Sequence, residues 1–109
     1  MRLLAFAASL RRGSINRKLL SVAAEAARRQ GAEVEEHPFD EFVFPYYDGD
    51  LESTSGLPEA VIRLGRLIEA SDGLLLASPE YNFSMPGTLK NTIDWISRIK
   101  PTPLRGKWA

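Results

Sequence analysis

Two loops hold most of the side chains in this sequence that could bind a charged or planar ligand. The first loop spans residues 9–16 and places hydroxyls, arginines and an amide around a glycine, just before a helix expected to begin at Ile15. Hydroxyls, guanidinium groups and the unpaired N–H groups of a helix start are the donors that a phosphate monoester needs. The alternative is that Ser14 is an ordinary N-cap and that the arginines are solvated surface residues. The donor side chains of this loop are those of Ser9, Arg11, Arg12, Ser14 and Asn16.

The second loop, SPEYNFSMPG, combines aromatic rings and an amide with a turn bracketed by Pro79 and Pro86. Such a turn can hold backbone N–H and C=O groups against a planar heteroaromatic ring, while Tyr81 or Phe83 covers apolar surface. The alternative is a purely structural turn, with Asn82 in a tight conformation and no ligand. From the residue types alone, both interpretations remain open.

Composition excludes several classes of function. The 109 residues include 14 basic and 14 acidic side chains, so no net charge attracts the chain to nucleic acid or to an anionic membrane. The chain has no cysteine and only one histidine, His37, which argues against a metal site. The apolar run at residues 3–8 is too short for a secretory leader, and no run approaches a membrane span. We therefore expect a cytoplasmic protein.

Hydrophobic periodicity predicts alternating strands and helices. Continuous apolar runs predict buried strands at residues 3–8 and 73–79, and the alternation of AEVEEH predicts an edge strand at 32–37. Helical spacing of apolar residues predicts three helices, with Leu89, Ile93 and Ile96 of the third facing inward. The segment 38–56 has no sustained period and is expected to be a long loop. The helices span residues 15–30, 57–71 and 88–98.

This order predicts an α/β fold with a parallel sheet. Right-handed crossovers place the first two helices on opposite faces and give strand order 2-1-3. The two polar loops would then follow adjacent strands at a topological switch point, where open α/β sheets bind ligands.

The run SLRRGSIN, followed by PEYNFSMPGTLKNTIDW after the third strand, resembles the NADPH-dependent FMN reductases, a flavodoxin-like family with three-layer sandwiches. The two motifs and their spacing cover nearly the whole chain. The resemblance implies that residues 1–109 are the N-terminal part of one FMN-binding domain, and that strands four and five of the family are missing. The family usually has a glycine where this chain has Ala8.

The resemblance also implies a role for each loop. In this family NAD(P)H passes a hydride to FMN, which reduces a small-molecule acceptor such as a quinone, chromate or an azo compound. No side chain need act as acid or base, because the flavin carries the chemistry. Ser9, Arg11, Ser14 and Asn16 would hold the FMN phosphate, and Pro79, Glu80, Tyr81 and Asn82 would line the isoalloxazine ring.

The helix at 88–98, with Trp95, resembles the family's subunit-contact helix and implies a homodimer or homotetramer. An amphipathic helix is more commonly an intramolecular core helix, and both roles can coexist.

The expected truncation would expose the third strand as an apolar edge. Two alternatives to the reductase remain: a flavin-binding electron carrier without a nicotinamide site, and an inactive structural fragment.

Overall fold

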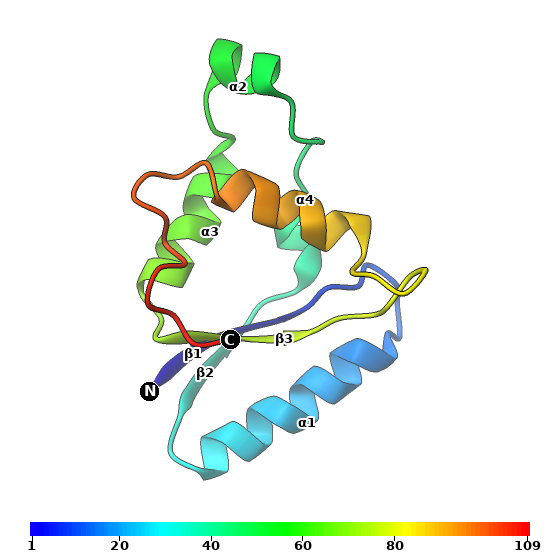
Figure 1. The fold of residues 1–109 in the computed structure, drawn as a ribbon. Coiled ribbons are helices and arrows are strands. Elements are labelled where there is room, and N and C mark those ends of the chain that lie inside the picture. The colour runs from blue at the N-terminus through cyan, green and yellow to red at the C-terminus, as the bar shows by residue number, and fades with distance from the viewer.

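A computed structural model describes all 109 residues and shows a parallel three-stranded sheet in the order β2-β1-β3 (Figure 1). The strands are β1 (Arg2–Ala7), β2 (Glu33–Glu36) and β3 (Gly73–Ala77). Both pairings are parallel, with Leu3 of β1 opposite Val34 of β2 and Gly73 of β3. The predicted α/β class and strand order are confirmed.

Helices cover both faces of the sheet, which gives three layers (Figure 1). The helix α1 (Ile15–Arg29) lies on one face, and α3 (Glu59–Glu69) and α4 (Gly87–Ile96) lie on the other. Alternation along β1 divides its buried side chains between these faces. Leu4 and Phe6 join a core cluster of 12 buried residues beneath α3 and α4, whereas the α1 face has a cluster of only 4.

The segment predicted as one long loop is structured, which corrects the expectation for residues 38–56. It contains the 3₁₀ helix η1 (Phe39–Phe42) and the helix α2 (Gly49–Ser55). Phe39, Phe42 and Phe44 are buried, and the first two pack on Phe6 with ring centroids 5.7 and 5.3 Å apart. These phenylalanines anchor the segment, while α2 buries no residue and projects from the body (Figure 1).

The apolar residues of α1 and α4 are not all buried as their spacing predicts. In α1 only Leu20 and Ala24 are buried, whereas Leu19 and Val22 are exposed. In α4 Leu89 and Ile96 face the core as expected, but Ile93 remains 37% exposed. No element in the structure packs over these exposed positions.

The last residues of the chain return to the sheet beside β3. Trp108 forms an isolated parallel bridge with Gly73, and its carbonyl accepts a hydrogen bond from the amide of Leu74 at 2.8 Å. A Cβ atom on Gly73 would lie 2.9 Å from the Trp108 carbonyl oxygen, so a glycine is needed for this close approach.

Candidate cofactor-binding site

The two polar loops begin side by side. The amide of Ala8, where the first loop starts, donates a hydrogen bond to the carbonyl of Ala77 at the end of β3, at 2.7 Å. From this point both loops extend past the carboxyl ends of their strands at the same edge of the sheet (Figure 1). The predicted juxtaposition at the switch point is therefore present in the structure.

Two buried serines shape the first loop. The Oγ of Ser9 accepts a hydrogen bond from the amide of Arg11 at 3.4 Å. The Oγ of Ser14 accepts one from the amide of Arg17 at 3.3 Å and caps α1, so the N-cap interpretation of Ser14 is correct. Because both hydroxyls act as acceptors here, each keeps its O–H free to donate to a ligand.

The first loop also presents a run of backbone donors. Gly13 has a φ of +67°, and the amides of residues 12–16 make no hydrogen bond within the chain. These amides lie at the positive end of α1, in the same segment as the exposed Arg11 and Arg12 and the half-buried Asn16. This donor set fits a phosphate group.

The second loop folds into a tight turn that projects from the end of β3. The amide of Tyr81 donates to the carbonyl of Ser84 at 2.9 Å, and the reverse bond is 3.0 Å long. The central residues Asn82 and Phe83 have φ values of 51° and 64°, the pattern of a type I′ turn. The amides of Glu80 and Asn82 make no hydrogen bond within the chain.

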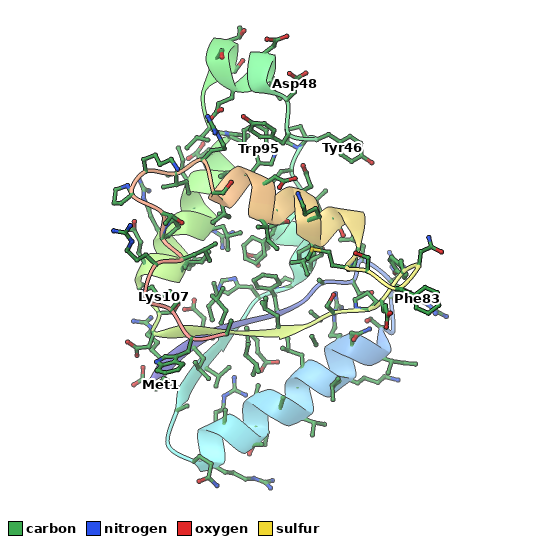
Figure 2. The ribbon with its side chains drawn as sticks, viewed as in Figure 1. Met1, Tyr46, Asp48, Phe83, Trp95 and Lys107 are labelled. Carbon is green, nitrogen blue, oxygen red and sulfur yellow. The ribbon has the colours of Figure 1, made fainter.

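Exposed aromatic side chains surround this turn. Phe83 is 98% exposed at the tip of the loop (Figure 2), and Tyr81 is 57% exposed. Pro79 is half-buried and Glu80 is exposed. Free amides next to accessible rings suit a planar heterocycle with polar edges, so the residues of this loop fit a flavin ring.

The helix α4, which follows the second loop, is tied to residues 44–47 through a side chain that sequence reasoning did not select. The side-chain amide of Asn91 donates to the carbonyls of Phe44 and Pro45 at 3.3 and 3.0 Å. Its Oδ1 accepts from the amide of Tyr47 at 2.8 Å. Asn91 is one of several polar residues in this helix, so no specific sequence signal indicates this role.

Trp95 is fully buried within the chain, as the intramolecular interpretation expects. Its indole packs edge-on against Tyr47, with ring centroids 5.0 Å apart, between α4 and the segment leading to α2 (Figure 2). The expected subunit contact through the helix at 88–98 stays a prediction.

The space between the two loops is an open surface, not an enclosed cavity. None of the five hollows in the structure is lined by residues of both loops. One of them, of about 240 Å³, lies on the β2 side of α1 and is lined by Arg17, Ser21 and His37 among others. Residues 1–109 would therefore contact a ligand at the switch point from one side only.

The two ionisable groups with shifted pKa values lie outside both loops. A hydrogen bond from His37 and an ion pair with Arg63 at 2.8 Å lower the pKa of Glu41. A hydrogen bond to Glu52, 2.9 Å long, raises the pKa of Tyr47. Neither group is placed to exchange protons with a ligand at the switch point.

Comparisons with known proteins identify the family of this chain. The family model for NADPH-dependent FMN reductases matches residues 1–109. The chain belongs to this family. Its FMN reductase relatives include the quinone reductase of Escherichia coli, which is 40% identical over 100 residues, covering 91% of this chain and 52% of the relative. The NAD(P)H:quinone oxidoreductase of Solanum tuberosum is 43% identical over 90 residues, covering 83% and 46%.

Solved structures of FMN reductase relatives show the same fold. The flavoenzyme NAD(P)H:acceptor oxidoreductase FerB of Paracoccus denitrificans superposes with a TM-score of 0.79 at 37% identity, covering 97% of this chain and 56% of FerB. The flavodoxin-like fold is thereby confirmed. The chain spans about half the length of the relatives it matches. None of its helices has the length and apolarity required to cross a membrane.

Proposed function

We propose that this chain forms the FMN-binding part of an NAD(P)H-dependent reductase. The observation that carries the proposal is the adjacency of two loops with unused donors, joined at their bases by the 2.7 Å bond from Ala8 to Ala77. Residues 1–109 would form the N-terminal part of one flavodoxin-like domain, consistent with the shared fold of FerB.

Within this proposal the first loop binds the FMN phosphate. The amides of residues 12–16 and the hydroxyls of Ser9 and Ser14 would donate to its oxygens, and Arg11 would supply the positive charge. Asn16, in the first turn of α1, adds an amide donor. A phosphate dianion at the start of α1 is also stabilised by the helix dipole.

The second loop orients the ring. Pro79, Glu80 and Asn82 would present backbone groups to the polar edge of the isoalloxazine, and Tyr81 would cover its apolar surface. Bound FMN supplies the redox chemistry by accepting a hydride from NAD(P)H. The loop then fixes the orientation of the ring and restricts the side from which small molecules reach it.

We propose a quinone as the electron acceptor, because relatives from bacteria and plants are named for that activity. Chromate and azo compounds remain further candidate acceptors.

We also propose that the protein is a cytoplasmic homo-oligomer. Since Trp95 is buried, any contact through α4 would use its exposed positions, such as Ile93.

Binding of FMN to the purified chain tests this proposal. We expect a flavin absorption spectrum, quenching of FMN fluorescence on titration, and quinone-dependent oxidation of NADPH. Arg11→Ala should weaken FMN binding about tenfold, the effect of losing one charge-assisted hydrogen bond. Arg66→Ala is the matched control, because Arg66 is an exposed arginine on α3, away from both loops.

Equal FMN affinity in the two arginine variants would contradict the assigned phosphate site. Tight FMN binding without NADPH oxidation would instead favour the electron carrier. No FMN binding at all would leave only the structural role.

A further inference from the structure

A cavity opens where the pairing of β1 with β2 stops. The last bond of this ladder runs from the amide of His37 to the carbonyl of Ala5, at 2.9 Å. In a parallel ladder the next bond would run from the amide of Ala7 to the carbonyl of His37, and this bond is absent. Ala7 is only 4% exposed, so its amide is a buried donor without a partner in the chain. Such a donor needs water or a ligand to accept its hydrogen bond.

The cavity, of about 240 Å³, is lined by the last residues of both strands, Ala7 and Glu36. Open α/β sheets bind their ligands at these carboxyl ends. The helix α1 contributes Arg17 and Ser21 to the lining. The backbone amide of Arg17 also donates to the Oγ of Ser14 at 3.3 Å, so the cavity adjoins the first loop. None of the residues assigned to FMN lines it.

Arg17 gives this cavity a positive charge that no carboxylate neutralises. It makes no ion pair in the structure. The carboxylate in the lining, that of Glu36, lies 3.0 Å from Arg28 and accepts a hydrogen bond from Ser21 at 3.4 Å. The negative charge of Glu36 is therefore already paired. An unpaired guanidinium beside a buried N–H donor fits an anion.

The reductase family uses an anionic co-substrate to which the two loops assign no residue. The family is NADPH-dependent, and NADPH differs from NADH by one phosphate, on the 2′ position of its adenosine ribose. An arginine near the end of the second strand is a known partner for such a phosphate in dinucleotide-binding sheets. A cavity of about 240 Å³ admits a ribose and its phosphate but not a whole dinucleotide.

We propose that this cavity binds the 2′-phosphate and ribose of NADPH, and that Arg17 selects NADPH over NADH. The guanidinium of Arg17 pairs with the phosphate, and the amide of Ala7 donates to a phosphate or ribose oxygen. The inference rests on the proposed function, because NADPH must also reach a flavin at the two loops. β2 and β3 both neighbour β1, so their ends lie about 10 Å apart. The pyrophosphate of NADPH links its two halves across that distance.

Binding of NADP⁺ and NAD⁺ to the full 109-residue chain tests this inference without catalytic turnover. Calorimetric titrations with and without FMN measure both affinities, and we expect NADP⁺ to bind at least about tenfold more tightly than NAD⁺. Arg17→Ala should remove this preference and leave the affinity for NAD⁺ unchanged. Lys18→Ala is the matched control, because Lys18 is the next exposed cation of α1 and does not line the cavity. The amide NMR signal of Ala7 should shift when NADP⁺ binds.

Equal affinities for NADP⁺ and NAD⁺ in the unsubstituted chain, or a preference that survives Arg17→Ala, would overturn the inference. An equal loss of preference in Lys18→Ala would overturn it as well, because general surface charge would then explain the preference. Circular dichroism would show that both variants remain folded. Arg17→Ala should leave FMN affinity unchanged, which separates this inference from the proposed function. A chain that binds FMN but does not prefer NADP⁺ contradicts this inference alone, whereas a chain that binds no FMN contradicts the reductase proposal.

Discussion

The indole Nε1 of Trp95 donates a hydrogen bond to the carbonyl of Pro45 at 2.7 Å, across fifty residues of sequence. This bond ties α4 to the segment between η1 and α2. Trp95 is fully buried, so both its ring and its N–H contribute to the packing of this region.

Trp95→Phe should therefore destabilise the protein. The substitution removes the bond to Pro45 and leaves space beside Tyr47, which together cost about 1–3 kcal/mol in the free energy of unfolding. Urea denaturation followed by circular dichroism measures the change. Trp108→Phe is the control, because Trp108 is 71% exposed and should tolerate the same change. Equal losses in the two variants would contradict a special role for Trp95.

Ser14→Asp should separate folding from phosphate binding. Aspartate is as good an N-cap as serine, so α1 should still form, which circular dichroism would show, whereas the carboxylate at this buried position should lower the melting temperature. Its carboxylate would repel a phosphate at the amides of residues 12–16, and FMN affinity should fall at least about tenfold. Fluorescence titration with FMN measures this loss. An unchanged FMN affinity in this variant would mean that the phosphate binds elsewhere.

Phe83→Gly should relieve backbone strain in the turn at residues 81–84. Phe83 has a φ of 64° and is 98% exposed, so it gains almost no burial for its left-handed conformation. The variant creates Asn-Gly, the preferred pair for a type I′ turn, and should stabilise the fold by about 0.5–1 kcal/mol. Thermal denaturation would show this rise in stability. A clear loss instead would mean that the phenyl ring packs against something in solution.

Gly73→Ala should displace Trp108 from the edge of β3. The new methyl group would lie 2.9 Å from a backbone oxygen, and relief of this clash should cost about 1–2 kcal/mol. The amide of Leu74 should then exchange its hydrogen faster, because its acceptor is the Trp108 carbonyl. Gly49→Ala is the control, since no atom lies within 4 Å of its added Cβ. Unchanged exchange at Leu74 would rule out this contact.

Glu41 should contribute to the loss of stability in acid. Its pKa is lowered by the hydrogen bond from His37 and by Arg63, so the folded protein binds the proton more weakly than the unfolded chain. The resulting stabilisation is complete above the ordinary value of 4.5 and is lost as the pH falls through the lowered pKa. Glu41→Gln should therefore flatten the acid limb of a plot of melting temperature against pH. Glu33→Gln, at an exposed position without an ion pair, should not.

Sequence patterns predicted the sheet order and the two polar loops because each signal is local. Apolar runs identify β1 and β3, and the handedness of crossovers then determines which loops meet. The motif around Asn82 predicted a tight turn at the position where the structure has one. The assigned roles of the loop residues toward a flavin remain predictions.

The segment at residues 38–56 could not be predicted, because its order depends on distant partners. Phe39, Phe42 and Phe44 have no regular period, and they become a core element only where Phe6 and α4 lie above them. Leu19 and Val22 show the opposite case. Their helical spacing is typical of a face that packs in a core. Both are exposed in the structure, because no other element packs against them.

The hydrogen bonds of α4 have a consequence for the second loop. Asn91, Thr92 and Trp95 all donate to carbonyls between Phe42 and Pro45, so α4 and this segment should move together. The turn at residues 81–84 directly precedes α4 (Figure 1). Its position should therefore depend on how residues 42–45 pack, as well as on the end of β3.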